Sequence, residues 1–550
     1  MATEQRNVVG RKTDIDAFIV GAGFGGMHML YWLRDKLGFS ARVYEAGSDV
    51  GGTWFWNRYP GARCDSESIY YMFPDHVSEE ILQEWTWSER YARQPEILRY
   101  LQFVADKLDL RRDIQFDTRV ASAVFDEDSN RWEITTESGD RVVARFFITA
   151  VGCLSTPFTP QFKGIESFEG PSFHTAEWPQ GDVDFTGKRV AVIGTGATAV
   201  QIVPEIAAQT DHLYVFQRTP NHDLPGHNHP LDEDYIREVK ATYKDIWKTA
   251  REAPFGFPYP QGTTSALEVT PEERQSAYEA SWERGSLVAF GGTFSDIGIS
   301  KDANDTANEF MRSKIREIVH DPEVADLLMP KYPFGTKRPP IEHGYYEAFN
   351  RDNVNLVDVR RAPIEEITPK GVRTADAEYE VDCIIYATGF DAMTGTLLRM
   401  DIHGRGGATL KEKWADGPRT YLDLTTQGFP NMFMITGPQS PSVLTNMVMS
   451  IEQHVEWIGG CMDHMREQGH ECIEALPEAE EGWMAHHTEV AESTMMLQTD
   501  SWWVGANVPG KKRILYPYVA GLPTYRAKCD EVAANNYEGF ALSAQPVAAG

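Results

Sequence analysis

"DAFIVGAGFGGMHMLYWLRDKLGFSARVYEAG", residues 16–47, is the stretch that decides the fold. It predicts a strand, a tight turn, a helix and a second strand, and the turn carries G-x-G-x-x-G as Gly21, Gly23 and Gly26. The first glycine permits the turn, the second lets a pyrophosphate approach the backbone, and the third lets helix and strand pack closely. Glu45 ends the second strand, at the distance where an acid bonds a ribose 2′-OH. A glycine-rich turn alone is weak evidence, but with both strands, the helix and the acid in register it predicts a nucleotide with a free 2′-hydroxyl, such as FAD.

A second turn of the same kind lies in residues 187–219, "GKRVAVIGTGATAVQIVPEIAAQTDHLYVFQRT". Gly194 and Gly196 take the first two glycine positions, and Ala199 takes the third, which the motif permits. The next strand ends in Arg218 rather than in an acid. A carboxylate there would repel a 2′-phosphate, whereas a guanidinium can bind it with two hydrogen bonds. The alternative is a solvated surface arginine, but its place at the strand end favours NADPH.

Two further strands predict how the chain passes between these sites. "FITAVG" (147–152) is typical of a strand leaving the first domain, and "YEVDCIIYATGFD" (379–391) of one returning to it. Residues 119–149 alternate polar and apolar positions around turn signals, as an antiparallel meander does. We therefore expect an α/β protein with two Rossmann-like dinucleotide-binding domains, the NADP domain inserted in a discontinuous FAD domain and carrying a helical insert. The expected limits are 1–152 and 387–550 for the FAD domain, 153–220 and 331–386 for the NADP domain, and 221–330 for the insert.

The insert carries no nucleotide signal, but it shows helical periodicity. Apolar residues recur at helical spacing in two runs, Ile236, Val239, Tyr243 and Ile246, then Ala307, Met311, Ile315 and Ile318. Asn304 or Asp305 is expected to cap the second helix. The aromatic, proline-rich patch "APFGFPYPQG" (253–262) is expected to be a loop.

Composition excludes several classes of protein. The 550 residues include 81 acidic and 52 basic ones, a formal charge of −29, which opposes binding to nucleic acid and stable association with anionic membranes. The start has no apolar core like that of a signal peptide, and the six scattered cysteines form no C-x-x-C pair. We expect a cytoplasmic protein without a metal site, and not a disulfide reductase, which needs a redox-active cysteine pair.

A family resemblance rests on "FEGPSFHTAEWP", residues 168–179. It matches F-x-G-x-x-x-H-x-x-x-W-P, the fingerprint of Baeyer–Villiger monooxygenases, with Phe168, Gly170, His174 and the Trp178-Pro179 pair. The chain resembles this family over nearly its whole length, including residues 51–71, 333–340, 435–447 and 500–511. Relatives that oxidise nitrogen or sulfur carry a similar segment but usually lack the Trp-Pro pair. In the segment itself we expect a structural coupler between two domains, anchored by its aromatic residues.

The resemblance implies a reaction. NADPH reduces FAD, the reduced flavin traps O₂ as a C4a-peroxide, and the peroxide adds to a ketone, which rearranges to an ester or lactone. The nearest alternative is a flavin monooxygenase that oxidises amines or sulfides, and a more distant one is a non-catalytic dinucleotide-binding protein. The expected partners are a ketone and O₂, and the expected oligomeric state is a monomer or a weak dimer. Ketone identity does not follow from the sequence.

The resemblance also implies a set of site residues. Arg338 matches the cation that faces the reacting oxygen, and Asp65 the carboxylate that holds it. Lys337 matches the residue that joins Arg218 and Thr219 at the 2′-phosphate, and Trp502 the residue that closes over NADP. Ser442, Val443, Leu444 and Thr445 are expected to line the ketone pocket. The other cofactor-binding residues implied are Thr53, Trp54, Tyr71, Val120, Met447, Thr195, Ala197, Thr198 and Gln201, with Asp65 and Arg338 also touching cofactor.

Overall fold

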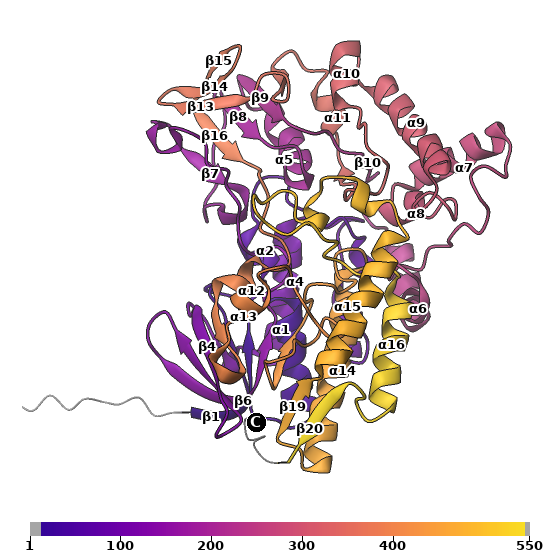
Figure 1. The fold of residues 1–550 in the computed structure, drawn as a ribbon. Helices are drawn as coiled ribbons and strands as arrows, with labels where there is room; N and C mark the ends of the chain where they lie inside the picture. Colours follow the sequence, from indigo (N-terminus) through magenta and orange to yellow (C-terminus); the bar gives the residue numbers. More distant parts are fainter. Residues whose placement is uncertain (1–12, 545–550) are drawn as a thin grey trace, which may run out of the picture.

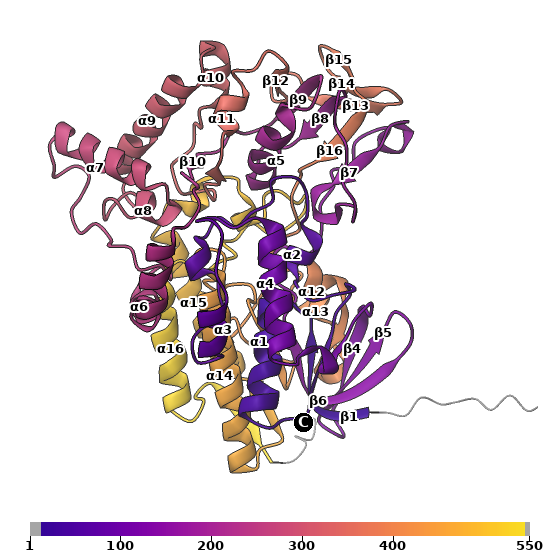
Figure 2. The same cartoon turned by 180° about the vertical axis from the view of Figure 1, so that it is seen from behind.

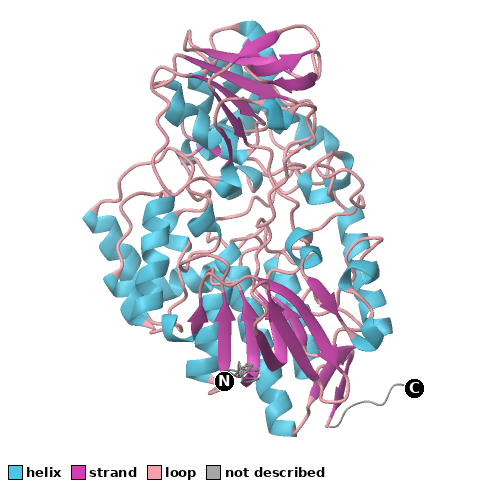
Figure 3. Ribbon diagram, turned by 90° about the vertical axis from the view of Figure 1, so that its left-hand side faces the viewer, coloured by secondary structure: helices cyan, strands magenta, loops and turns pink. Residues whose placement is uncertain are grey.

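Two β-sheets at opposite ends of the molecule organise the fold (Figure 3). The computed structural model describes residues 13–544. The lower sheet in Figure 1 combines the start of the chain with its last third, and the upper sheet is built from the middle. This is the α/β architecture that the sequence predicts, with one dinucleotide-binding domain inserted in another.

The lower sheet has the strand order β17-β4-β5-β6-β1-β2-β3, and β18 pairs with β6. Its strands are β1 (Thr13–Val20), β2 (Ala41–Tyr44), β3 (Ile114–Gln115), β4 (Val120–Asp126), β5 (Arg131–Thr136), β6 (Arg141–Thr149), β17 (Asp401–His403) and β18 (Met432–Met434). Strand β1 runs parallel to β2 and β6, while β4, β5 and β6 form the expected antiparallel meander. Because β18 pairs in parallel with β6, residues 285 positions apart, such as Phe147 and Met432, lie side by side in one sheet.

Helices cover this sheet with apolar faces. Helix α1 (Phe24–Tyr31) follows the first glycine turn and packs against α14 (Met447–Gln468). The other helices of this half are α2 (Thr53–Trp56), α3 (Glu79–Glu84), α4 (Gln94–Lys107), α12 (Gly395–Arg399), α13 (Leu410–Lys413), α15 (Pro477–Glu492) and α16 (Leu522–Ala534). The small hairpin β19 (Cys472–Ala475) with β20 (Phe540–Ser543) closes the far end. No helix in residues 13–544 has the length and apolar character needed to cross a membrane.

The upper sheet is entirely parallel, in the order β12-β9-β8-β16-β7. Its strands are β7 (Ser172–His174), β8 (Arg189–Ile193), β9 (His212–Gln217), β12 (Val354–Asp358) and β16 (Cys383–Tyr386). Helix α5 (Ala197–Ala207) follows the second glycine turn. A three-stranded antiparallel sheet of β13 (Ile364–Thr368), β14 (Gly371–Thr374) and β15 (Glu378–Glu380) stands beside it, and α11 (Tyr345–Ala348) packs on α5.

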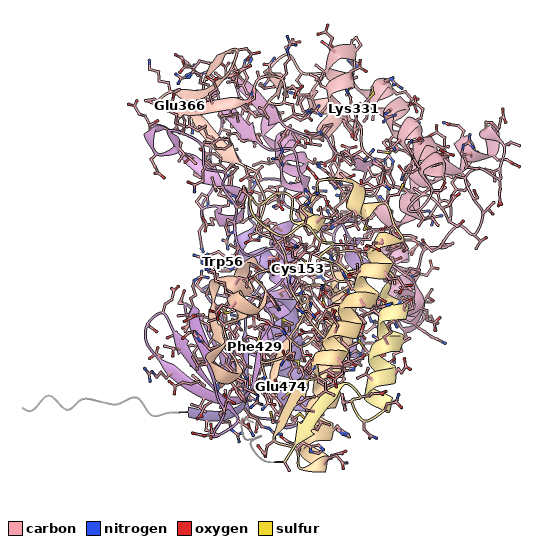
Figure 4. All side chains as sticks on the ribbon, in the orientation of Figure 1. Trp56, Cys153, Lys331, Glu366, Phe429 and Glu474 are labelled. Atoms are coloured by element: carbon pink, nitrogen blue, oxygen red, sulfur yellow. The ribbon has the colours of Figure 1, made fainter. Side chains whose placement is uncertain are left out.

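Two antiparallel linkers join the halves. The outgoing linker after β6 bridges to the returning linker after β16 at Pro157 and Phe390, with hydrogen bonds from Phe158 N to Gly389 O (2.9 Å) and from Asp391 N to Thr156 O (2.9 Å). In Figure 4, Cys153 marks this waist, between Lys331 and Glu366 above and Phe429 and Glu474 below.

The segment between β10 (Leu224–Pro225) and β11 (Ile341–Glu342) is helical, as expected, but it does not form one body. Helices α7 (Pro271–Arg284), α8 (Leu287–Gly291) and α9 (Lys301–Ile318) share a small apolar core, and α10 (Pro322–Leu328) follows. Helix α6 (Glu233–Glu252) instead joins the core of the lower half, where Trp247 is fully buried, and lies beside α16 in Figure 2.

The expected cap of α9 was wrong. The helix begins one turn earlier, at Lys301, because the Ser300 hydroxyl accepts a hydrogen bond from Ala303 N (3.4 Å). Asn304 is fully buried inside the helix and serves the site described below.

Candidate active site

The first glycine turn has the geometry of an open cradle. Gly21 has φ of +99°, and a Cβ at Gly26 would collide with the Gly21 carbonyl. Gly23 is the N-cap of α1 and brings no capping side chain, so the free N–H groups of the first helical turn can meet a pyrophosphate. Gly52, with φ of +51°, lies against Gly23 and narrows the approach from the other side.

Glu45 lies under this turn rather than projecting freely. One carboxylate oxygen accepts a hydrogen bond from Ala22 N (2.7 Å) and the other from Gly47 N (2.7 Å). Burial raises the pKa of Glu45, and the backbone N–H groups oppose that rise. An ionised carboxylate has about four acceptor sites, so two remain for a ribose hydroxyl.

The other predicted residues of the flavin half lie on several different elements. Thr53 begins α2, and Trp54 Nε1 donates to the Tyr71 hydroxyl (3.3 Å), whose ring packs on Phe24 of α1. Val120 begins β4 near the end of the Glu45 strand, and Met447 begins α14. Tyr71 therefore contacts the helix after the first turn, Val120 follows a segment that bonds the Glu45 carbonyl, and Met447 packs in an apolar cluster with Trp502.

The second turn repeats the cradle. Gly194 has φ of +112°, and a Cβ there would collide with the Ala387 carbonyl, while a Cβ at Gly196 would meet nothing within 4 Å. Ala197 begins α5, Thr198 follows it, and Ala199 is fully buried where the motif places its third small residue. Thr195 Oγ1 donates to the Thr219 carbonyl (2.9 Å), which ties the turn to the strand end that carries Arg218.

Arg218 and Lys337 form a basic pair beside the second turn. Burial, and then the charge of Arg218, lower the pKa of Lys337 to about 8. Lys337 Nζ lies 5.1 Å from the centre of the Tyr332 ring, and within residues 13–544 neither cation forms an ion pair. The charge of Asp500 also acts on Lys337, but Asp500 is paired with Arg513, so the two cations remain available to a doubly charged phosphate.

Arg338 meets Asp65 across the two halves. Arg338 Nη1 and Asp65 Oδ2 are 2.6 Å apart, and the side chains are 29% and 4% exposed. Burial lowers the pKa of Arg338, but the charge of Asp65 outweighs it and the net shift is upward, so the guanidinium stays charged. A buried carboxylate both neutralises the arginine and fixes the plane of its guanidinium.

Gln201 of α5 joins the second nucleotide turn to this pair. Its amide nitrogen donates to Asp65 Oδ1 (3.2 Å) and to the Arg63 carbonyl (3.1 Å). Its amide oxygen accepts from the Tyr59 hydroxyl (2.8 Å). The carboxylate that orients Arg338 is therefore itself oriented by the NADP domain.

Asn304, which the sequence predicted only as a cap, holds the segment that leads to Arg338. Its side chain accepts from Phe334 N (2.8 Å) and donates to the Phe334 carbonyl (2.9 Å), as a neighbouring strand would. Asn308, one turn on, donates to Asn304 Oδ1 (2.8 Å). In the sequence, the sign of this role was the presence of two amide side chains, Asn304 and Asn308, on an otherwise apolar helix face.

A cavity of about 60 Å³ opens at the Arg338–Asp65 pair. Its walls are Asp65, Ser66, Glu67, Tyr91, Phe257, Tyr259, Ser286, Leu287, Val288, Arg338, Val443, Leu444 and Thr445. Ser442, the fourth predicted pocket residue, lies outside this lining, fully buried with its hydroxyl 2.5 Å from that of Ser440. Phe257 and Tyr259 come from the aromatic, proline-rich loop after α6, which the sequence predicted as a loop but not as part of the site.

The segment that carries Trp502 is tied to the cations. Thr499 Oγ1 and Thr336 Oγ1 are 2.7 Å apart, next to Lys337. Lys511 Nζ donates to Asp391 Oδ1 (2.5 Å) in the returning linker. Trp502 packs with Val443 and Met447 in one apolar cluster, so this segment connects residues 435–447 with the loop that carries Lys337.

The fingerprint segment lies over the linkers. His174 Nε2 lies 3.4 Å from the Phe158 carbonyl and 3.4 Å from Thr388 Oγ1, one residue of each linker. Trp178 is buried in the core of the upper half, and a Cβ at Gly170 would lie 2.7 Å from the Asp382 carbonyl. These contacts match the structural coupler that the sequence predicts.

One trio in residues 13–544, His76 with Glu452 and Glu456, has the spacing of metal ligands. Glu452 already bonds the Arg251 guanidinium, and it accepts from Trp247 Nε1 (3.0 Å). Because the Arg251 guanidinium neutralises the buried Glu452 carboxylate, we interpret the trio as part of the contact between α6 and α14.

The two cradles fit the cofactors that their sequences predict. Both turns lack a capping side chain where a pyrophosphate would lie, and each presents glycines where a Cβ would collide with backbone. Glu45 keeps acceptors for a ribose diol, and the Arg218–Lys337 pair suits a 2′-phosphate. FAD in the first and NADP in the second therefore agree with the residues present.

Comparisons with known proteins give the same result. A family model described as flavin-binding monooxygenase-like matches residues 16–224. A Baeyer–Villiger monooxygenase of Pseudooceanicola batsensis is 44% identical over 98% of this chain and 97% of its own. A phenazine N-monooxygenase of Lysobacter antibioticus is 43% identical over 97% of this chain and 98% of its own.

Solved structures agree over the same length. An oxidized steroid monooxygenase bound to NADP is 48% identical, with a TM-score of 0.92 over 96% of this chain and 100% of that one. OTEMO in complex with FAD and NADP is 42% identical, with a TM-score of 0.93 over 97% of this chain and 100% of that one.

Fold and site together define a flavoprotein monooxygenase that uses FAD and NADPH. The identity to the relatives above exceeds 40% over nearly the full length. The chain therefore belongs to the Baeyer–Villiger monooxygenases. Its reaction is the insertion of one oxygen atom of O₂ next to a ketone carbonyl, which gives an ester or lactone.

Proposed function

We propose that Arg338 and Asp65 form the catalytic pair of this reaction. The observation that carries the proposal is the 2.6 Å contact between them at the mouth of the cavity. When bound, FAD reduced by NADPH supplies the activated oxygen. The Arg338 guanidinium stabilises negative charge on the substrate oxygen as it develops, and Asp65 keeps the guanidinium aimed at that point.

The two cofactors are proposed to be held by different kinds of group. On the flavin side, backbone N–H groups after Gly23 receive the pyrophosphate, Glu45 the ribose, and Trp54 with Tyr71 the face of the ring system. On the other side, Arg218, Thr219 and Lys337 receive the 2′-phosphate, and Trp502 covers the nicotinamide half. The proximity of Arg218 to Lys337 and the Thr336–Thr499 contact support this assignment.

The cavity walls favour a ketone with an apolar body. Phe257, Leu287, Val288, Val443 and Leu444 provide an apolar side. On the opposite side the charge of Glu67 is already matched, by Arg90 and by the Tyr259 hydroxyl. Because Arg338 is paired with Asp65 as well, a charged substrate would find no free counter-ion among the described residues there, and a neutral ketone fits best.

A second candidate reaction is oxygenation at nitrogen. It is favoured by one observation, the full-length similarity to a phenazine N-monooxygenase. An amine or sulfide would need no anion-stabilising guanidinium at a carbonyl oxygen, and the intact Arg338–Asp65 pair favours the ketone.

The domain limits stay a proposal: 1–152 and 387–550 for FAD, 153–220 and 331–386 for NADP, and 221–330 for the insert. The position of the crossing linkers supports the limits of the FAD and NADP domains. The limits of the insert are less clear-cut, because α6 packs on the flavin half. We also propose a cytoplasmic protein, a monomer or weak dimer, without nucleic-acid or stable membrane partners, as its charge of −29 suggests.

Product analysis tests the proposed function. Holoenzyme with NADPH and O₂ is offered small linear, arylaliphatic, cyclic and steroid ketones, and separately tertiary amines and sulfides. Ester or lactone formation that depends on Arg338 is expected. Efficient N- or S-oxide formation that survives Arg338→Ala, without any ester, would assign the second reaction instead.

A further inference from the structure

A second cavity, of about 470 Å³, lies where the flavin half, the helical insert and the NADP domain meet. Its walls are Arg63, Pro225, Gly226, His227, Asn228, Trp282, Ile318, Glu342, His343, Gly344 and Glu347. None of these residues lines the substrate cavity. The volume lies in the range of small-molecule sites, about 300–1,000 Å³.

Arg63 brings a buried charge to this cavity. The residue is 7% exposed, and among residues 13–544 its guanidinium has no hydrogen-bond or ion-pair partner. Two arginines that are only half-buried are neutralised by acids, Arg90 by Glu67 and Arg251 by Glu452. Burial, and then the nearby Arg93, lower the pKa of Arg63, but a guanidinium remains charged at neutral pH. An unpaired buried charge is costly unless a counter-ion meets it.

Both basic and acidic groups surround Arg63: besides burial, the charge of Arg93 lowers its pKa, and the charges of Glu89, Glu205 and Asp65 raise it. His343 Nε2 is buried and has no partner in the described chain, and the His343 ring feels the charges of Arg63, Arg93 and His227. Arg93 is matched by Glu205 (2.8 Å). His343 therefore adds a second polar group without a hydrogen-bond partner among the described residues to the wall that contains Arg63.

The carboxylates of the cavity are directed elsewhere. One oxygen of Glu342 accepts from Gly344 N (2.7 Å) and Tyr345 N (2.9 Å), and Glu347 is exposed at the rim. In the described part of the chain, neither acid forms an ion pair with Arg63. The Arg63 guanidinium therefore faces this cavity as a charge that, within residues 13–544, is not half of a salt bridge.

We propose that this cavity binds a small oxyanion, a metabolite with a carboxylate or phosphate group. The planar fork of Arg63 holds two oxygens of the anion, and His343 contacts a third. The rest of the ligand lies against Trp282 and Ile318, which give the cavity its apolar wall.

The position of Arg63 links this cavity to the active site. Gln201 Nε2 donates both to the Arg63 carbonyl (3.1 Å) and to Asp65 Oδ1 (3.2 Å). An anion that fixes Arg63 therefore stabilises one arrangement of the segment that orients Arg338. This consequence rests on the proposed function, whereas binding of the anion does not.

Isothermal titration of the holoenzyme tests the site, with saturating NADP⁺ present so that the 2′-phosphate position is filled. Inorganic phosphate and citrate are the probes. We expect one saturable site per chain with a Kd below about 1 mM for at least one probe, equivalent to about 4 kcal/mol. Arg63→Met should weaken it at least about tenfold, about 1.4 kcal/mol. Arg361→Met, which removes an exposed arginine, should leave the Kd unchanged.

Three results would overturn the proposal: no saturable binding up to about 10 mM, which is a free energy under about 3 kcal/mol; equal binding by Arg63→Met; or loss of binding on Arg218→Ala instead. If Arg63→Met does not fold, crystals of the unaltered holoenzyme with selenate replace it. An anomalous selenium peak within hydrogen-bond distance of Arg63 supports the site, and its absence refutes it. If the proposed function fails instead, the holoenzyme forms no ester but still binds the anion. The failure of the proposed function and the failure of the anion site can therefore be distinguished.

Discussion

The two glycine-rich turns share one backbone design, but their charged residues are used differently. At the first turn, both oxygens of Glu45 bond backbone N–H groups of the turn and of the following loop. At the second, Arg218 and Lys337 face each other with no acid bonded to either in the described chain. At the first turn the charged side chain already has protein partners, whereas at the second turn the two cations have no ion-pair partner in the described residues. This is the difference expected between a cofactor that stays bound and one that exchanges in each cycle.

The largest effect on activity is expected from substitution of Arg338, the arginine that the NADP domain contributes to the substrate cavity. Arg338→Ala should lower ester formation about 10²- to 10³-fold, because one preorganised donor to the developing oxyanion is lost. Reduction of the flavin by NADPH should continue, and stopped-flow absorbance with product analysis separates the two steps. Arg361→Ala is the matched control at an exposed site. Normal oxygenation by Arg338→Ala would remove this residue from its role.

Arg218→Ala tests whether the second turn depends on its free cation. The KM for NADPH should rise about 10- to 100-fold, the value of a hydrogen bond to a charged group of about 1.5–3 kcal/mol. The KM for NADH, which lacks the phosphate, should change little. Initial rates with both nucleotides give the comparison, and equal effects would mean that the 2′-phosphate lies elsewhere.

The pH dependence of NADPH use should follow Lys337. Its pKa is lowered to about 8, so the side chain is protonated below that pH and loses its charge above it. Since the 2′-phosphate favours the protonated form, the KM for NADPH should increase as pH rises above 8, by at most about tenfold per unit. Lys337→Met should raise the KM at pH 7 and flatten the profile. A parallel increase with NADH would contradict this origin.

The smallest effect is expected at the first turn. Glu45→Gln keeps the shape of the side chain but offers one acceptor oxygen in place of two, which costs about 1 kcal/mol. FAD should dissociate about fivefold more readily, measured as flavin per chain after dialysis. A stronger effect on NADPH than on FAD would reverse the comparison between the turns.

The sequence predicted local chemistry well and packing between distant segments poorly. The glycine turns, Glu45, Arg218 and the meander follow short rules of spacing, so they could be recognised without coordinates. The Arg338–Asp65 contact joins residues 273 positions apart, and only family resemblance suggested it.

The remaining features depend on tertiary context. Ser300 displaces Asn304 as a cap because Asn304 bonds the Phe334 backbone, a partner 30 residues away. Helix α6 has the same periodicity as its neighbours, yet its apolar face, which includes Trp247, packs on the flavin half. Periodicity shows that a helix has a buried face, but it does not show which surface covers that face.

The pairing of β18 with β6 has a consequence for synthesis of the chain. Strand β6 ends at Thr149, but β18, which pairs with its last three residues, begins at Met432. At roughly 5–20 residues per second, a ribosome needs roughly 15 to 60 s to add the second after the first. During that interval the upper half can fold to completion, while the unfinished edge of β6 stays exposed to other chains. A chaperone that protects nascent strands would therefore act on the flavin half, and raising the translation rate should improve the yield of folded enzyme.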